Sequence, residues 1–200
     1  MENMLQCFPS SIVTSIIEKN TDVLKKEANF VNSNYQEDTG NNDFRILKKY
    51  PKVKKILLEK FKKVAREKLG YSNDFAISTS WITTIETGGE VQQHCHKNSF
   101  YSGIYYYDEY EQNKGGKLEL QSPLINLRDF YLIPKDWNHS NSNVIEISPI
   151  KNLLVLFPSY LFHRVLTYHG TITRRSLAFN IVPTGSYGHG DSFYDTSWRG

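Results

Sequence analysis

Residues 153–183 read LLVLFPSYLFHRVLTYHGTITRRSLAFNIVP, and this stretch decides the fold. It contains three runs of aliphatic, β-branched and aromatic residues, at 153–157, 163–168 and 173–182. A turn signal, His169-Gly170, lies between the last two. Short runs of this composition, bounded by turn residues, are typical of strands. We therefore expect three consecutive strands here.

The same pattern extends towards the N-terminus as far as residue 75. Turn signals at Gly88-Gly89 and at Asn113 to Gly116, and the polar segment 134–143, separate the runs. Such a succession of short strands is typical of an antiparallel sandwich or barrel. The further strands that we expect cover residues 75–85, 90–96, 101–107, 117–121, 130–133 and 144–148.

The N-terminal third and the C-terminal tail show other patterns. Apolar residues recur near the helical period over 10–28, which predicts a helix, and the polar segment 30–44 indicates a loop. Pro51 fits the first turn of a second helix over 51–69. We therefore expect one domain with a helical part over 1–70, a strand-rich core over 75–183 and an irregular tail over 184–200.

Composition favours a globular protein in a reducing compartment. The 200 residues are 39% hydrophobic and 14% aromatic, which suits a sheet-rich domain. Two cysteines, Cys7 and Cys95, offer no disulfide framework. The start of the chain lacks the features of a signal peptide, and no stretch approaches the ~20 apolar residues of a membrane span. We therefore expect a soluble, cytoplasmic protein without a membrane partner, and its oligomeric state stays open.

The expected helix over 51–69 is strongly basic. A nucleic-acid partner is one interpretation, and a solvent-facing surface opposite an apolar stripe is the other. We favour the second, because the net charge of +3 is small and no nucleic-acid-binding motif accompanies the helix. The basic residues are Lys52, Lys54, Lys55, Lys60, Lys62, Lys63, Arg66 and Lys68.

Three histidines are candidate metal ligands. His94 and His96 lie two residues apart in an expected strand, so their side chains project from the same face. His163, from a distant strand, can complete one face of a metal ion. Cys95 then faces away from the metal. The remaining histidines lie in expected loops, and we interpret them as ordinary residues: His139, His169 and His189.

Five motifs, in order, resemble those of the 2-oxoglutarate- and Fe(II)-dependent oxygenases, and most closely a small bacterial and phage branch of them. The match covers about residues 75–183, and the N-terminal third is outside it. The resemblance implies a mainly β (α+β) fold, a double-stranded β-helix or jelly roll with N-terminal helices packed on one sheet. The motifs are His94-Cys95-His96, Ser102 to Tyr106, Gly115 to Leu118, Phe157 to His163 and Arg174 to Asn180.

The resemblance also implies an Fe(II) site, in which His94 and His163 match the two family histidines. Most members use a carboxylate as the third ligand, and His96 occupies that position here. Three neutral imidazoles do not reduce the charge of Fe(II), and the dianion 2-oxoglutarate can balance it. The alternative is that His96 forms a hydrogen bond nearby and leaves an extra open position on the iron, as in halogenase-like enzymes.

The co-substrate 2-oxoglutarate needs a cation for its distal carboxylate, and arginine offers two parallel donors. Arg174 and Ser176 share a strand face and match the R-x-S element of the family. A register error of one residue would exchange Arg174 with Arg175. Tyr106 matches a tyrosine that binds the same carboxylate in prolyl-hydroxylase-like relatives, with core packing as an equal alternative. Weaker candidates for this site are Ser102 and Asn180.

The activity that the resemblance implies is decarboxylation of 2-oxoglutarate to succinate and CO2, coupled through O2 to oxidation, by default hydroxylation, of a small molecule or peptide. Desaturation and halogenation are the other outcomes of this chemistry. Two other classes stay open, because one fold hosts many functions. They are a cupin-like three-histidine metalloenzyme that does not use 2-oxoglutarate, and a non-enzymatic jelly-roll binding or structural module.

Overall fold

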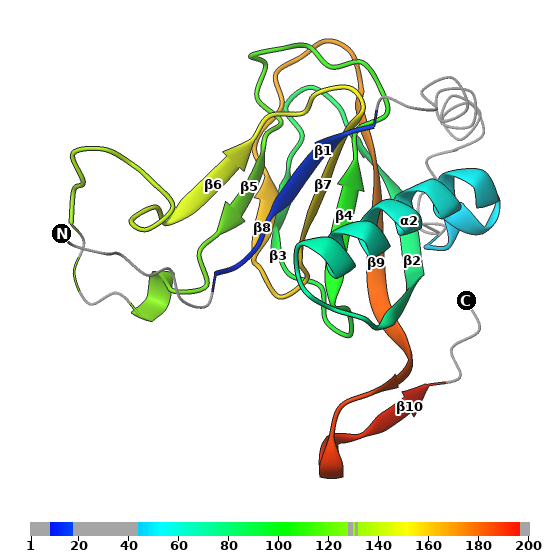
Figure 1. Cartoon of the computed structure of the whole chain (residues 1–200). Coiled ribbons are helices and arrows are strands. Elements are labelled where there is room, and N and C mark those ends of the chain that lie inside the picture. The colour runs from blue at the N-terminus through cyan, green and yellow to red at the C-terminus, as the bar shows by residue number, and fades with distance from the viewer. Residues whose placement is uncertain (1–8, 18–43, 128–129, 131, 197–200) are drawn as a thin grey trace.

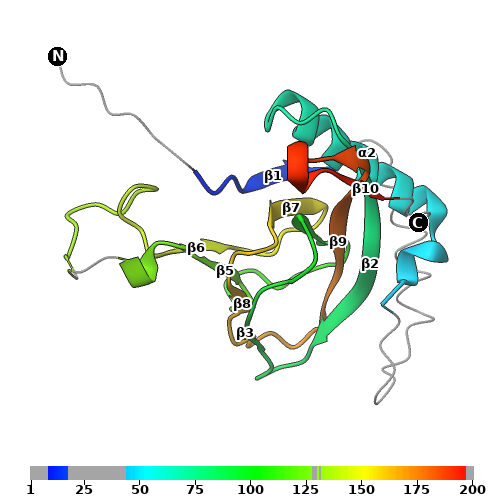
Figure 2. The same ribbon diagram turned by 90° about the horizontal axis from the view of Figure 1, so that it is seen from below.

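The computed structural model describes residues 9–17, 44–127, 130 and 132–196. Within these ranges the chain forms two facing antiparallel sheets, with one α-helix on the outside of the larger sheet (Figure 1 and Figure 2). The elements are β1 Val13–Ile16, η1 Ile46–Lys48, α2 Pro51–Glu67, β2 Asp74–Ile85, β3 Val91–His94, β4 Tyr101–Tyr105, β5 Leu118–Gln121, η2 Ile125–Leu127, β6 Val144–Ile147, β7 Leu153–Pro158, β8 His163–Val165, β9 Arg174–Tyr187, η3 Gly190–Ser192 and β10 Tyr194–Thr196.

The larger sheet has the strand order β1-β7-β4-β9-β10, and β2 also pairs with β9. The β2–β9 ladder runs from Asp74 opposite Thr184 to Ile85 opposite Arg174. This long ladder is one wall of the molecule, and β9 joins it to the centre of the sheet through β4. The start of β9 therefore lies deep in the fold, where Arg174 is only 1% exposed.

The smaller sheet has the order β3-β8-β5-β6. Its central strand β8 pairs with β3 on one side and β5 on the other, so that His163 lies between His94 and Leu120. Apolar side chains from both sheets pack together between them and exclude water. This core cluster comprises Tyr106, Leu118, Leu120, Leu153, Val155, Phe157 and Leu161.

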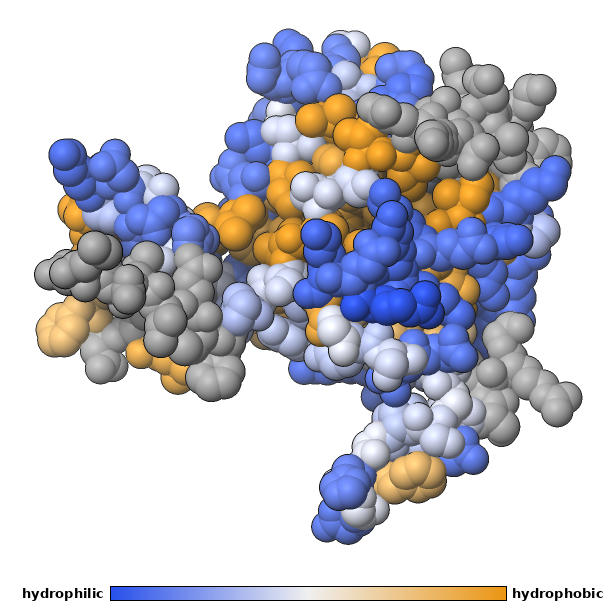
Figure 3. All heavy atoms as spheres, in the orientation of Figure 1, coloured by the Kyte–Doolittle hydropathy of each residue, from blue (hydrophilic) through white to orange (hydrophobic). Residues whose placement is uncertain are grey.

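Helix α2 covers the outer face of the larger sheet. It begins at Pro51, as the sequence predicts, and Gly70, just beyond its end, adopts a positive φ of 76°. Its buried stripe packs on the sheet, and the Phe61 ring lies 5.0 Å from that of Phe75. The opposite side is hydrophilic (Figure 3), and Lys55 pairs with Glu59 one turn away at 3.8 Å. Burial of the apolar stripe explains why a helix so rich in lysine is stable.

The mainly β fold with two antiparallel sheets is confirmed, but the helix predicted over 10–28 is wrong at its start. Residues 13–16 form strand β1, which pairs with β7 from Val13 opposite Leu156 to Ile16 opposite Leu153. The backbone hydrogen bonds of this pairing outweigh a weak helical periodicity. Residues 18–28, and 30–43 of the expected loop, lie outside the described residues.

Two expectations near the C-terminal half are also corrected. The described residues of the expected strand 130–133 are not in a strand, and Phe130, Leu132 and Ile133 are 78–86% exposed. The tail expected to be irregular is partly ordered, because β9 continues to Tyr187 and pairs with β10. The glycine and aromatic residues of this segment do not alternate in the way that is typical of strands, so the sequence does not indicate this hairpin. The expected loop 134–143 is free of helix and strand.

No helix among the described residues is long and apolar enough to cross a membrane.

Candidate functional site

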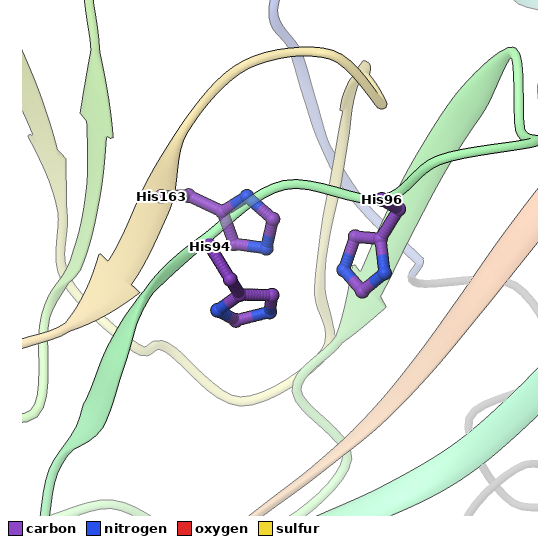
Figure 4. A group of neighbouring side chains, drawn as sticks. All are labelled: His94, His96 and His163. Carbon is purple, nitrogen blue, oxygen red and sulfur yellow. The ribbon is translucent and has the colours of Figure 1, made fainter.

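The three predicted histidines come together between the sheets (Figure 4). His94 ends β3 and His163 begins β8, where the two are direct cross-strand partners with ring centroids 4.4 Å apart. The His96 ring lies 5.1 Å from each of them. Each residue offers one ligand atom, and these atoms lie within 4.8 Å of one another. Because an imidazole–metal bond is about 2.0–2.1 Å long, small side-chain rotations bring all three nitrogens onto one ion.

The strand predicted over 90–96 is shorter than expected. Alternation along one strand therefore does not explain why His96 meets the other two histidines. β3 ends at His94, and His96 lies in the irregular segment that follows (Figure 4). The His96 amide donates a hydrogen bond to the Ser159 carbonyl at 3.0 Å. His96 is therefore held by the end of β7 and not by alternation along one strand. Cys95 is a free thiol and is not a member of the histidine cluster.

Backbone carbonyls orient two of the three rings. Nδ1 of His94 is 2.7 Å from the Gln92 carbonyl oxygen, and Nδ1 of His163 is 2.9 Å from that of Leu161. A carbonyl can only accept, so in each neutral ring Nδ1 carries the proton and Nε2 keeps a free lone pair. Such a bond fixes both the tautomer and the direction of a metal-binding imidazole.

Burial keeps the imidazoles neutral. Desolvation, together with the neighbouring His94, lowers the pKa of His96 to about 4. Desolvation also lowers the pKa of His163 to about 4, with smaller contributions from His94 and His96. Metal ions bind the deprotonated ring, so both side chains are ready to act as ligands at neutral pH.

Arg174 supplies a buried cation in the same cavity. Its Nε donates to the Gly116 carbonyl at 2.9 Å and its Nη2 donates to the Tyr106 hydroxyl at 3.3 Å. Its Nη1 is buried, and no hydrogen-bond partner for it occurs among the described residues. A buried guanidinium nitrogen without a partner is costly. This nitrogen is therefore available to donate to an anionic ligand.

Gly116 explains why the G-G-x-L motif is needed. It has a positive φ of 66°, and an added Cβ would lie 3.0 Å from Cδ of Arg174 and 3.2 Å from its Nε. Glycine alone therefore permits both the backbone conformation and the close approach of the arginine. The Gly115-Gly116 pair indicates in the sequence that a special backbone conformation occurs here, but it does not show that Arg174 is the side chain that approaches Gly116.

The structure resolves the register of the two arginines. Arg174 points inwards and lines the cavity together with the buried Ser176. Arg175 points outwards, where its Nη1 lies 3.6 Å from a carboxylate oxygen of Asp108. The exchanged assignment is therefore excluded by geometry, and a role of Arg174 and Ser176 in holding a carboxylate stays a prediction.

Two other candidates lie behind the cavity wall. Tyr106 is fully buried and is not among the cavity-lining residues; its hydroxyl accepts a hydrogen bond from Arg174, and burial raises the pKa of this hydroxyl. Asn180 is hydrogen bonded to Ser102 and Thr79 and is not among the cavity-lining residues. The structure thus gives Asn180 partners within the protein, and the co-substrate contact expected of it stays a prediction.

Trp81 is a cavity residue that the sequence did not single out. It lies on β2, lines the cavity, and its ring is 5.3 Å from that of His96. The alternation of β2 contains a signal for this, since Trp81 and Thr83 share the face that lines the cavity. Only the pairing of β2 with β9 shows which face of β2 is directed into the cavity.

Comparison with known proteins agrees with this site. Residues 79–180 match the family model described as "Putative 2OG-Fe(II) oxygenase". No curated protein matches the sequence at a significant level.

Several solved structures share the fold. A prolyl-4-hydroxylase from Pseudomonas putida matches with a TM-score of 0.56 and 14% identity, over 86% of this chain and 84% of that one. Iron-bound HygX from Streptomyces hygroscopicus matches with a TM-score of 0.60 and 9% identity, over 88% and 83% of the two chains. At such identities the likeness concerns the fold alone, and it confirms the expected double-stranded β-helix.

Proposed function

Because this chain belongs to the 2-oxoglutarate- and Fe(II)-dependent oxygenase superfamily, we propose that it is an iron(II) dioxygenase. It decarboxylates 2-oxoglutarate to succinate and CO2 and couples this to oxidation of a second substrate with O2. Hydroxylation is the outcome we propose. The second substrate is a small molecule or a peptide, and nucleic acid is not part of the proposal.

One observation carries this proposal: a buried arginine, whose Nη1 has no hydrogen-bond partner among the described residues, shares one cavity with three convergent histidines. His94, His96 and His163 would hold Fe(II) through their ring nitrogens. The Nη1 of Arg174 would donate to the distal carboxylate of 2-oxoglutarate, and this nitrogen has no hydrogen-bond partner among the described residues. The three histidines thus fit Fe(II), and Nη1 of Arg174 fits the carboxylate of 2-oxoglutarate; these are the two groups that the family uses.

Each residue has a definite task in such a site. The iron and the co-substrate, when bound, supply the oxidising chemistry. The three histidines would hold the ion, and the dianionic co-substrate would balance its charge. Tyr106 and Gly116 fix the guanidinium group of Arg174. Apolar neighbours such as Phe157 and Ile104 keep water from the cavity.

Anaerobic titration with Fe(II) and 2-oxoglutarate tests the proposal without knowledge of the second substrate. We expect a visible metal-to-ligand charge-transfer band that requires both components. The matched variants are Arg174→Gln, which should abolish the band at moderate 2-oxoglutarate concentrations, and Arg175→Gln, which should keep it. A cupin-like enzyme would bind Fe(II) but give no band with 2-oxoglutarate, and a binding module would bind neither; either result would overturn the proposal.

A further inference from the structure

Three residues from three separate motifs meet in one buried hydrogen-bonded chain that the proposed chemistry does not use. Ser102 lies on β4, Ser159 follows β7, and Asn180 lies on β9. Oγ of Ser102 is 2.9 Å from Oγ of Ser159 and 2.8 Å from Oδ1 of Asn180. Ser159 and Ser102 are 0% and 2% exposed. Polar side chains this deeply buried are retained only when they are well satisfied.

The chain continues at both ends. Oγ of Ser159 donates to Oγ of Ser99 at 2.9 Å, and Ser99 donates in turn to the main-chain carbonyls of Tyr101 and Ile181, each at 3.1 Å. Because carbonyls only accept, the direction at this end is fixed: Ser159 donates to Ser99. The single hydroxyl proton of Ser102 is then shared between Oγ of Ser159 and Oδ1 of Asn180, both of which accept.

At the other end, Nδ2 of Asn180 donates to Oγ1 of Thr79 on β2 at 3.0 Å. The amide orientation follows from this pattern, since Oδ1 accepts from Ser102 while Nδ2 donates to Thr79. The network thus spans β2, β9, β4 and the end of β7 and reaches the segment after β3.

That segment carries His96. Main-chain hydrogen bonds attach both of its ends to Ser159: the His96 amide donates to the Ser159 carbonyl at 3.0 Å, and the Ser159 amide donates to the Phe100 carbonyl at 3.1 Å. The Phe100 amide donates to the Ile181 carbonyl at 2.9 Å. Ser99, inside the segment, is the acceptor of the Ser159 hydroxyl. The position of residues 96–100 therefore depends on Ser159 and on its buried neighbours.

His96 needs this support more than the other two histidines. Within the described part of the chain, the His94 and His163 rings each have a carbonyl partner, whereas no hydrogen bond to the His96 ring is found. The Trp81 ring is tilted by 46° against it and restricts only one side. The direction of the His96 ring is therefore set mainly by where its backbone is held.

We propose that Ser159, Ser102 and Asn180 are positioning residues that hold His96 in place as the third metal ligand. The proposal rests on the proposed function in one respect, namely that the histidine cluster binds a metal ion. It explains why the serine of F-P-S, the serine of S-G-x-Y-Y and the asparagine of A-F-N occur together. Outer residues that orient a metal ligand typically change metal affinity by roughly 10- to 100-fold when they are removed.

Cobalt(II) titration of the metal-free protein is the test, because the visible Co(II) spectrum reports both affinity and coordination number. Ser159→Ala removes the hydroxyl but keeps the main-chain bonds. We expect its Co(II) affinity to fall roughly 10-fold, with a spectrum shifted towards that of His96→Ala. Ser102→Ala should act in the same direction, and Ser102→Thr, which restores a hydroxyl, should recover most of the affinity.

Ser80→Ala is the matched control. Ser80 is 2% exposed, lies on β2 of the same sheet, and its hydroxyl accepts the Leu47 amide at 2.9 Å; among the described residues no hydrogen bond joins this hydroxyl to residues 96–100. We expect a lower melting temperature in this variant and an unchanged Co(II) affinity. An equal loss of affinity in Ser80→Ala would mean that general destabilisation, not positioning, explains the effect.

The two proposals fail in different ways. If the wild-type protein shows no Co(II) binding that depends on His94 and His163, the proposed function fails. If the wild-type protein binds Co(II) through these residues but Ser159→Ala and Ser102→Ala bind it equally well, only the positioning proposal is overturned. Should Ser159→Ala not fold, the Ser102→Ala and Ser102→Thr pair decides.

Discussion

His94 and His163 are direct cross-strand partners, and their rings lie 4.4 Å apart. The backbone ladder of β3 and β8 therefore fixes two of the three candidate ligands relative to each other. His96 reaches the same point from a different part of the backbone. The centre thus consists of a rigid pair and a third, separately held residue, and variants of these residues should not behave alike.

Loss of either member of the pair should abolish specific iron binding, whereas changes at His96 should be graded. We expect His96→Ala to bind Fe(II) more weakly than the wild type. His96→Asp would recreate the commoner two-histidine, one-carboxylate set and should retain iron and a measurable uncoupled conversion of 2-oxoglutarate to succinate. Anaerobic metal titration and succinate assays check this. Equal iron affinity of wild type and His96→Ala would favour the halogenase-like arrangement with two histidines.

Replacement of Arg174 by Gln should weaken 2-oxoglutarate binding and leave iron binding nearly intact. Loss of a desolvated charged partner should cost roughly 2–5 kcal/mol of binding free energy. Calorimetric titration of 2-oxoglutarate into metal-loaded protein measures it. Arg175→Gln is the control, since that side chain pairs with Asp108 on the outside. A large loss in the control with none in Arg174→Gln would contradict the assignment.

The glycine beside Arg174 should matter for the co-substrate as well as for stability. Gly116→Ala forces a side chain into a positive φ, which costs about 1–2 kcal/mol, and pushes Cβ against the arginine. Gly70→Ala imposes similar backbone strain, but nothing lies within 4 Å of its Cβ. We expect both variants to unfold at lower temperature and only Gly116→Ala to lose affinity for 2-oxoglutarate. Identical 2-oxoglutarate affinities would show that the contact is tolerated.

The metal-free protein should lose stability as the pH falls from about 6.5 to about 4. Burial lowers the folded-state pKa values of His96 and His163 to about 4, from the ordinary value of about 6.5 for histidine. In this window the unfolded chain binds protons that the folded chain does not, so stability rises with pH. Metal affinity should fall over the lower part of the same range, because protons compete for the rings. Thermal melts of wild type and of the His96→Asn, His163→Asn double variant check this; an equally steep pH profile in the variant would refute it.

The sequence predicts the strands of the core and the inward direction of Arg174, because alternation and turn residues report which face of a strand is buried. It predicts the convergence of His94 and His96 for an incomplete reason, since alternation stops where β3 ends. It does not reveal the hydrogen-bond partners of Asn180, because sharing a strand face with Arg174 does not show how far along the cavity a side chain lies or which residues it meets. These partners come from β4 and β2, which are distant in the chain.

The β2–β9 ladder joins Asp74 to Thr184 and Ile85 to Arg174, and this has a consequence for biosynthesis. Pairings between such distant segments form slowly, because a long loop must close first. While the ribosome is still adding β9, β2 has no partner along its length, and the apolar residues between the sheets stay open to water. Newly made chains should therefore be prone to aggregate until β9 has emerged from the ribosome, and the histidine cluster should acquire its metal only after the two sheets have assembled.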